Sequence, residues 1–462
     1  MNSMNDSFID ENSIASDLAQ EKQDASAARS VLEKARTLCG LDPQDAATLI
    51  NNSDWAITEE LFETARFIKE TIYGKRVVLF APLYISNKCA NECAYCAFRS
   101  TNSTLRRTAL DTAALRQETE YLIRQGHKRI LLVSGELPAD TELNYICNAI
   151  DTVYAAIDGK NSIRRINVNI APLSTVGFKK LAQHAIGTYQ LFQETYHRPT
   201  YVAMHTRGPK ADYKFRLNVM DRAMEAGIND VGIGTLFGLY DWRFELLSLL
   251  HHARHLESTF GAGPHTISVP RIEPAHGSAV AAQPPYAVHD DDFKKIIAIL
   301  RCAVPYTGII LSTREQIAMR QECLALGVSQ ISAGSCTDPG GYTAKANHDG
   351  QFSLGDHRPL NEVIDDLITM GYIPSFCTGC YRMGRTGADF MDLAKPGAIK
   401  NHCDPNALST FKEYLLDYAS PATRAKGERL ITDSIKSMNG IAQTRAQKMV
   451  DMIDSGKRDE YC

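Results

Sequence analysis

The sequence predicts an α/β protein built on a (β/α)8 barrel. Short apolar runs alternate with amphipathic helical segments from Lys75 onward, eight such runs occur, and polar residues gather where several of them end. Eight βα units make a complete barrel of the TIM type, whose chemistry lies at the carboxyl ends of its strands. An open barrel of six units is the alternative. The expected strands are 77–85, 129–134, 164–170, 188–194, 229–237, 265–272, 307–313 and 329–334.

The segment before the barrel predicts a loose arm followed by a helical cap. Residues 1–28 are rich in Ser, Asp, Asn, Gln and Ala without a sustained apolar face, so we expect no stable element there. Asp42 and Thr58 each precede a run of helical periodicity as capping residues. Residues 29–74 are therefore expected to form an N-terminal helical cap, with helices at 29–39, 43–51 and 59–73.

The remaining helices fall between and after the strands. The barrel should extend over residues 75–358 and end in a polar, Gly-rich stretch and loop after the eighth strand. Residues 359–462 then predict a C-terminal helical extension, which opens with a helix at 360–371. Helices are expected between the strands, for example at 111–125, 213–226, 239–259, 291–303 and 314–326, and the tail of 406–452 is expected to be helical with breaks at Ser420-Pro421 and Gly440.

Composition narrows the functional class. The chain has 462 residues, 44% of them hydrophobic, and its 50 basic and 54 acidic residues are intermixed, giving a net charge of −4. Nothing in this balance indicates nucleic acid or an anionic membrane as a partner. The start of the chain lacks a basic region followed by an apolar stretch, and no window is long enough to cross a membrane. We therefore expect a cytoplasmic protein with a small substrate.

Three cysteines directly after the first strand carry the most information. Cys89, Cys93 and Cys96 are spaced C-x3-C-x2-C, and in a reducing cytosol clustered thiols are typical of metal ligands. Three thiolates can hold three irons of a [4Fe-4S] cube and leave the fourth iron open to a small chelating ligand. The alternative is a zinc knuckle that borrows a His, but the next His, His127, is too distant for finger spacing.

This motif resembles the signature of the radical S-adenosylmethionine (SAM) enzymes. The resemblance implies that the open iron binds the amino and carboxylate groups of SAM, and that one electron splits SAM into methionine and a 5′-deoxyadenosyl radical. Tyr95 and Phe98 lie beside the ligands, where an aromatic ring covers the cube, stacks on adenine or simply packs in the loop. Ser134-Gly135-Glu136 follows the second strand and resembles the Gly-Gly-Glu element that binds the methionine amino group.

Charged side chains at two further strand ends are candidates for binding SAM and substrate. Glu194 ends the fourth strand and Arg216 lies in the next helix. A carboxylate suits a ribose diol or ammonium, and a guanidinium suits a carboxylate. Arg314 ends the seventh strand, where it can bind the carboxylate of an amino-acid substrate with help from Ser312. For Arg314 the alternative is a charge-paired residue that caps the following helix.

A second cysteine group lies after the barrel. Cys377 and Cys380 form C-x2-C, and Cys403 follows after 22 residues. A chain that leaves the eighth helix emerges at the bottom of the barrel, so this group should lie on the order of 20 Å or more from the first. His265 begins the sixth strand, also at the bottom, and is a candidate ligand for an extra iron, the alternative being a structural role.

With both cysteine groups in place, the chain resembles the HydG family, the radical SAM tyrosine lyases that mature the H-cluster of [FeFe]-hydrogenase. The resemblance implies that tyrosine is cleaved to p-cresol and dehydroglycine and that this fragment passes down an apolar lumen. At a second [4Fe-4S] cluster with an additional iron, the fragment would yield CO and cyanide. Implied partners are L-tyrosine, L-cysteine or a similar ligand at the extra iron, ferredoxin or flavodoxin, and other hydrogenase maturation proteins.

Two other functions stay open on the sequence alone. The 2-iminoacetate synthases of thiamine thiazole biosynthesis are similar through the barrel but lack the C-terminal cysteine motif. A non-catalytic iron-sulfur carrier or scaffold is the third hypothesis. The strand-end groups argue against it, because a carrier needs no residues that bind an amino acid. These groups are Glu136, Glu194, Arg216 and Arg314.

Overall fold

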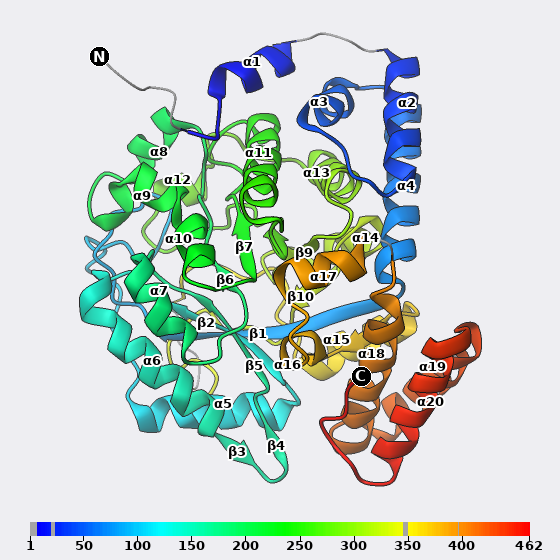
Figure 1. The fold of residues 1–462 in the computed structure, drawn as a ribbon. Helices are drawn as coiled ribbons and strands as arrows, with labels where there is room; N and C mark the ends of the chain where they lie inside the picture. Colours follow the sequence, from blue (N-terminus) through cyan, green and yellow to red (C-terminus); the bar gives the residue numbers. More distant parts are fainter. Residues whose placement is uncertain (1–6, 20–23, 345–349, 396) are drawn as a thin grey trace.

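The computed structural model describes residues 7–19, 24–344, 350–395 and 397–462. Within these residues, eight parallel strands close into a barrel that helices surround (Figure 1). The strands pair in chain order, and β10 pairs with β1 to close the ring. The complete (β/α)8 barrel is confirmed, and the open barrel is excluded. The barrel strands are β1 (Arg76–Ser86), β2 (Arg129–Ser134), β5 (Arg165–Asn169), β6 (Tyr189–Gln190), β7 (Val231–Gly234), β8 (Thr266–Ser268), β9 (Gly308–Leu311) and β10 (Gln330–Ser332).

Several strands are shorter than their apolar runs predict. The sequence predicts a strand at 188–194, but β6 ends at Gln190. Beyond it, the Leu191 N–H donates to the Gly232 carbonyl oxygen and the Gln193 N–H to the Gly234 carbonyl oxygen, and the isolated bridge Glu194↔Thr235 follows. The chain therefore stays beside its neighbour as far as the mouth of the barrel, although the regular strand is short.

The outer helices follow the expected order with two differences. The predicted helix 213–226 is divided at Asn218 into two short helices, and the predicted helix 314–326 begins only at Ile317 with Gln316 at its N-cap position. Arg314 therefore lies outside that helix and does not cap it. The helices are α5 (Thr112–Gln125), α6 (Ala139–Ala155), α7 (Thr175–Ala182), α8 (Arg198–Met204), α9 (Tyr213–Leu217), α10 (Val219–Glu225), α11 (Trp242–Phe260), α12 (Ala279–Ala282), α13 (Asp290–Ala303), α14 (Ile317–Leu326) and α15 (Leu360–Thr369).

Two of the three N-terminal helices begin earlier than predicted. The helix α3 (Pro43–Asn51) starts with the expected Asp42 cap. However, α2 (Ala25–Arg36) begins at an Asp24 cap, and α4 (Trp55–Tyr73) begins at an Asp54 cap instead of Thr58. An aspartate that accepts from the backbone N–H groups of the first turn fixes a helix start more strongly than apolar periodicity does. Figure 1 shows α2 and α4 along one side of the barrel, with α4 leading into β1.

Part of the arm predicted to be loose is a helix. The helix α1 (Glu11–Ala19) packs against α11, with Ile14 fully buried. Asp10 accepts from the N–H groups of Asn12 and Ser13 at its start. So short a helix is marginal by itself and depends on tertiary packing, which the local sequence does not reveal. The predicted arm also includes residues 1–6 and 20–23, which lie outside the described residues.

The C-terminal extension returns to the bottom of the barrel before it becomes helical. A strand that the sequence did not reveal, β11 (Ile373–Ser375), pairs with the first residues of β1 through Arg76↔Ile373. The following helices are α16 (Gly379–Arg382), α17 (Gly387–Ala394), α18 (Lys400–Asp417), α19 (Pro421–Ser437) and α20 (Gly440–Asp454). A small hairpin of β3 (Ile157–Asp158) and β4 (Asn161–Ser162) was also not expected. Among the helices of the described residues, none is long and apolar enough to cross a lipid bilayer.

The interior of the barrel is more polar than the expected apolar lumen. Asn169, Gln190 and Ser268 line the upper cavity, and Arg129 and Gln330 line the lower one. Gln190 donates to the Thr266 hydroxyl at 3.2 Å, and Arg129 donates from Nη1 to the Cys377 carbonyl oxygen, whereas Arg129 Nε is buried without a partner among the described residues. Polar groups are tolerated in a core when they are hydrogen-bonded. The interior of the barrel is therefore partly polar at both ends.

Candidate functional site

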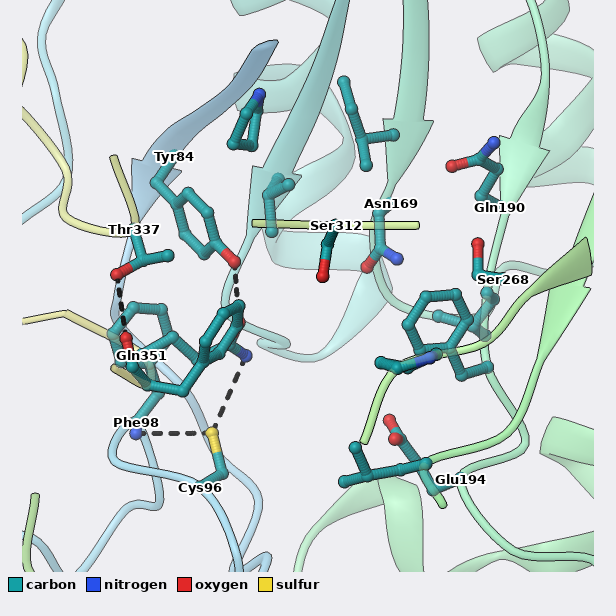
Figure 2. Close-up of a pocket in the computed structure, with 18 of the residues that line it drawn as sticks. Tyr84, Cys96, Phe98, Asn169, Gln190, Glu194, Ser268, Ser312, Thr337 and Gln351 are labelled. Carbon is teal, nitrogen blue, oxygen red and sulfur yellow. Dashed lines mark hydrogen bonds between the residues drawn. The ribbon is translucent and has the colours of Figure 1, made fainter. Parts of the chain in front are cut away.

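A large cavity opens at the carboxyl ends of the barrel strands. It encloses about 1380 Å³, including its open mouth. Figure 2 shows its lining residues, among them Asn169, Gln190, Ser268 and Ser312, reaching it from different strands. The structure brings together here all the residues predicted for the first site. They are Cys89, Cys93, Cys96, Tyr95, Phe98, Ser134, Gly135, Glu136, Glu194, Arg216, Ser312 and Arg314.

The loop that carries the three cysteines is shaped by one arginine. The Arg107 guanidinium donates to the carbonyl oxygens of Asn87 and Phe98, both at 2.8 Å, and to those of Arg99 and Asn102. The loop also crosses the end of β2 closely, and a Cβ at Gly135 would collide with the Lys88 carbonyl oxygen. Sequence reasoning missed Arg107, because a single arginine in a loop carries no pattern.

The thiols fit an iron-sulfur cube better than a single ion. Among the described residues, no three His, Cys, Asp or Glu side chains converge on one point where a metal ion could bind. Cube ligands do not need to converge, because each thiolate binds a different iron. Within the described chain, Cys89, Cys93 and Cys96 are the only Cys or His residues that line this cavity, so a four-ligand zinc site lacks its fourth ligand. Burial raises the pKa of all three thiols, that of Cys89 to about 11, so their deprotonation depends on the metal.

The two aromatic residues of the loop are fixed by buried partners. The His205 ring donates from Nδ1 to the Tyr201 carbonyl oxygen at 2.8 Å, so its Nε2 accepts from the Tyr95 hydroxyl, also at 2.8 Å. Burial lowers the pKa of His205 well below its ordinary value, which keeps the ring neutral. Phe98 packs edge-on against Tyr84 with ring centroids 6.0 Å apart. Sequence reasoning did not identify His205.

Four buried charges form a network at the mouth. Arg216 lies 3.0 Å from Glu136 and 3.5 Å from Glu194, and Lys210 lies 2.6 Å from Glu194 and 3.9 Å from Glu136. Burial by itself would raise the pKa of Glu136, but Arg216 and Lys210 outweigh it and hold that pKa below its ordinary value. Asn91 of the cysteine loop donates to Glu136 at 2.9 Å. Sequence reasoning missed both Lys210 and Asn91, which lie in loops without periodicity.

The backbone of Glu194 is held in an unfavourable conformation. Its φ is +72°, in the left-handed region that non-glycine residues rarely adopt. The Glu194 carbonyl oxygen accepts from the Thr235 hydroxyl at 2.6 Å and from the Leu236 N–H at 2.8 Å. Thr235 Oγ1 also lies 3.2 Å from Oε2 of the fully buried Glu245 and can accept from that carboxyl when it is protonated, because its own single proton is donated to Glu194. Glu245 therefore supports the turn that aims Glu194 into the cavity.

Arg314 presents an unpaired cation to the same cavity. Its guanidinium stacks on the Phe352 ring at 3.3 Å and donates to the Arg271 carbonyl oxygen at 3.4 Å. In the described part of the chain it forms no salt bridge, unlike Arg216. The Ser312 hydroxyl accepts from the Arg314 backbone N–H at 3.4 Å. An unpaired guanidinium in a cavity suits an external carboxylate.

A second cavity lies at the opposite end of the barrel. It encloses about 660 Å³ and brings together Cys377, Cys380, Cys403 and His265. Arg76, the first residue of β1, also lines it, whereas the cysteine loop of the mouth follows the last residue of β1. At about 3.3 Å per residue, β1 spans about 30 Å from one cysteine group to the other, although the cavities themselves approach each other along it, since Val78 lines the lower one and Phe80 the upper one. The sites lie at opposite ends, as the topology predicts.

The groups of the lower cavity have the chemistry of metal ligands. Cys403 and Cys380 share a hydrogen bond that lowers the pKa of Cys380 and raises that of Cys403. Burial lowers the pKa of His265, which favours the neutral ring that binds metals. His265 Nδ1 is buried and lies 3.7 Å from Asp230 without forming a hydrogen bond. The residues present therefore fit a thiolate-bound cluster with a neighbouring imidazole.

Comparison with known proteins agrees with this architecture. Residues 83–249 match the Radical SAM superfamily, and residues 268–373 match the Biotin and Thiamin Synthesis associated domain. The chain is 30% identical to the 2-iminoacetate synthase of Escherichia coli (strain K12), over 74% of this chain and 89% of that protein.

Two solved structures resemble the chain almost throughout. A crystal structure of HydG, a maturase of the [FeFe]-hydrogenase, is 48% identical, with a TM-score of 0.95 over 98% of this chain and 100% of the other. The FeFe-hydrogenase maturase HydG from Carboxydothermus hydrogenoformans is 41% identical, with a TM-score of 0.85 over 96% of this chain and 97% of the other.

The closed barrel and its three-thiol loop, taken with these matches, define a radical SAM enzyme that uses a [4Fe-4S] cluster and SAM. Among such enzymes, the chain belongs to the HydG family of [FeFe]-hydrogenase maturases.

Proposed function

We propose that this maturase is a radical SAM lyase that cleaves L-tyrosine to p-cresol and dehydroglycine. The dehydroglycine fragment is then converted to CO and cyanide ligands on iron for assembly of the [FeFe]-hydrogenase H-cluster. The observation that carries the proposal is the pairing of two cysteine-lined cavities at opposite ends of one barrel. The solved HydG structures extend over both ends of the chain, which supports the same reading.

At the mouth, Cys89, Cys93 and Cys96 would hold the first cluster. When bound there, the cluster and SAM supply the radical that removes a hydrogen atom from the substrate. Glu136 and Arg216 offer a carboxylate and a guanidinium for the amino and carboxylate groups of SAM. Glu194, Tyr95, Phe98, Ser134 and Gly135 line the same space and complete the proposed cofactor-binding set.

Arg314 and Ser312 are the proposed substrate-binding residues. The unpaired guanidinium can take the tyrosine carboxylate as a bidentate partner, and the Ser312 hydroxyl can add a hydrogen bond. Binding the carboxylate at Arg314 leaves the amino group and side chain of the substrate free to extend across the cavity. The mouth would thus bind an amino acid through its carboxylate.

At the bottom, Cys377, Cys380 and Cys403 would hold a second [4Fe-4S] cluster, with His265 as a ligand for an additional iron. L-cysteine or a similar small ligand would complete the shell of that iron. Dehydroglycine is small and polar, and the partly polar interior of the barrel suits its passage. A low-potential donor such as ferredoxin or flavodoxin would reduce the clusters, and other hydrogenase maturation proteins would receive the product.

Anaerobic incubation of the reconstituted protein with tyrosine, SAM and a reductant tests the proposal. We expect 5′-deoxyadenosine, p-cresol, CO and cyanide. The second candidate function is that of a 2-iminoacetate synthase, which the 30% identity to the Escherichia coli enzyme favours. Formation of p-cresol without CO or cyanide would support this second function. Absence of p-cresol would exclude both.

A further inference from the structure

A short segment after the barrel crosses the mouth beside the cysteine loop. We call it the strap, residues 350–353. Gln351 lies between Tyr84 and Cys96 (Figure 2). Its side-chain oxygen accepts from the Tyr84 hydroxyl at 2.8 Å, and its Nε2 donates to Cys96 Sγ at 3.7 Å. None of the sequence patterns pointed to this residue.

The chemistry of the sulfur fixes the orientation of the amide. A thiolate bound to iron can only accept hydrogen bonds, so the NH2 end of Gln351 must face Cys96 and the oxygen must face Tyr84. Cys96 also accepts from the Phe98 backbone N–H at 3.4 Å. In the described residues, Gln351 is the only side chain that donates a hydrogen bond to one of the three thiols at the mouth.

The strap is held in place on both sides. The Gln351 carbonyl oxygen accepts from the Ala97 N–H at 3.4 Å, and the Ser353 N–H donates to the Pro274 carbonyl oxygen at 2.8 Å. The Phe352 ring stacks on the Arg314 guanidinium at 3.3 Å. A donor held by its neighbours loses little entropy when it contacts the sulfur, so its hydrogen bond keeps most of its strength.

We propose that Gln351 is a positioning residue that makes the cluster at the mouth easier to reduce. One electron from an external donor adds one negative charge, part of which falls on the sulfur ligands. An N–H group that points at such a sulfur stabilises the reduced form more than the oxidised form, and therefore raises the reduction potential. Tyr84 contributes by holding the amide in the orientation that this effect needs.

The test is a redox titration of the reconstituted full-length protein without tyrosine, followed by electron paramagnetic resonance. The signal that changes on addition of SAM reports the cluster at the mouth. In Gln351→Leu we expect the ratio of reduced to oxidised cluster at the wild-type midpoint to fall about tenfold, a shift of about 59 mV for one electron. Gln351→Glu should shift further in the same direction, because it places a negative charge beside the sulfur.

Gln190→Leu is the matched control, because Gln190 lines the same cavity but contacts none of the three thiols. Its potential should stay at the wild-type value. An unchanged or higher potential in Gln351→Leu, with full iron content at the mouth, would overturn the proposal. If Gln351→Leu loses iron, Tyr84→Phe provides the test of the proposal instead, because it leaves the Gln351 amide in place. A smaller negative shift in Tyr84→Phe supports the proposal, and an unshifted potential contradicts it.

Discussion

The network at the mouth of the barrel contains four charged side chains, each of which would be costly to bury alone. Arg216, Lys210 and Glu194 are buried and Glu136 is nearly so, and the two cations lie against the two carboxylates. Removing one partner of such a network leaves an uncompensated charge, which costs far more than the pair contributes. The methionine part of SAM carries one ammonium and one carboxylate, so it can enter this network by exchanging one ion pair for another.

The three thiols at the mouth give the most direct prediction. Cys89→Ala, Cys93→Ala or Cys96→Ala should each abolish SAM cleavage, because two thiolates cannot hold a cube with one iron left open. The measurement is 5′-deoxyadenosine formed under reducing conditions. Cys39→Ala is the control, since Cys39 is exposed and lines neither cavity described here, and it should cleave SAM normally. Retained SAM cleavage in any of the three variants would show that this loop does not bind the cluster.

Arg314 gives a second prediction at the same scale. Arg314→Ala should raise the tyrosine concentration needed for half-maximal p-cresol formation far more than the SAM concentration. The loss of a charge-assisted bidentate contact costs about 1.5–3 kcal/mol. Arg314→Lys should recover part of the affinity, because it keeps the charge but loses the fork. Equal effects on tyrosine and SAM would place the tyrosine carboxylate elsewhere.

The functional residues at strand ends could be predicted from the sequence, but the residues that hold them in place could not. Glu136, Glu194 and Arg314 follow apolar strands, and parallel strands in a closed barrel bring all their carboxyl ends to one mouth. Lys210 and Gln351 reach the same cavity from connecting segments. Nothing in a loop sequence specifies which way it folds back, so residues of this kind appear only in three dimensions.

At the scale of elements, the junction of β6, β7 and α11 has a pH-dependent component. Glu245 on α11 accepts from the hydroxyl of Thr195 and the N–H of Tyr196, which hold the chain just beyond Glu194. Burial raises the pKa of Glu245 from 4.5 to about 7. The folded state therefore binds this proton more tightly than the unfolded chain does.

The stability that the neutral Glu245 carboxyl contributes is fully present below about pH 4.5 and is lost as the pH rises through about 7. The free energy of unfolding of the wild-type protein should fall across this window by up to about 3 kcal/mol. Glu245→Gln cannot ionise and should show a flatter profile. Thermal unfolding at pH 5 and pH 7.5 measures the difference. Parallel profiles for the two proteins would show that Glu245 does not titrate in this range.

The elements themselves were predictable to different degrees. All eight barrel strands follow from largely apolar runs, because parallel strands in a barrel are covered on both faces, although polar residues such as Asn169 and Gln190 interrupt the runs where they line the interior. The strand β11 has three residues, and it exists because the first residues of β1 offer free pairing groups. The helix α1 likewise depends on α11. Elements that are stabilised by a distant partner leave little trace in their own sequence.

The whole molecule joins two cavities that the proposed function uses in series. If the lower site only processes the fragment released at the mouth, the double variant Cys377→Ala with Cys380→Ala should still form 5′-deoxyadenosine and p-cresol while CO disappears. The measurement is product analysis of wild type and variant under the same reducing conditions. Normal CO formation would make the lower cysteines structural. Loss of p-cresol with an intact fold would show that the two sites are not independent.

A His265 variant tests the additional iron separately from the lower cluster. His265→Ala should keep the cluster that Cys377, Cys380 and Cys403 are proposed to hold, because all three thiolates remain. The loss of one imidazole should weaken the additional iron. Electron paramagnetic resonance of the reduced variant is therefore expected to show a cluster signal without the coupled signal of a fifth iron. A normal fifth-iron signal would assign that iron to other ligands.

The strand β1 reaches from one cavity to the other. Arg76 lines the lower cavity, and Ser86 leads into the cysteine loop of the mouth. Since one continuous strand separates the two sites, their spacing does not depend on how the outer helices move. A fragment released at the mouth and confined to the lumen would meet the lower site at a local concentration far above the one it would reach in bulk solution. Capture at the lower site would then remain fast at substrate levels that leave bulk solution almost free of the fragment.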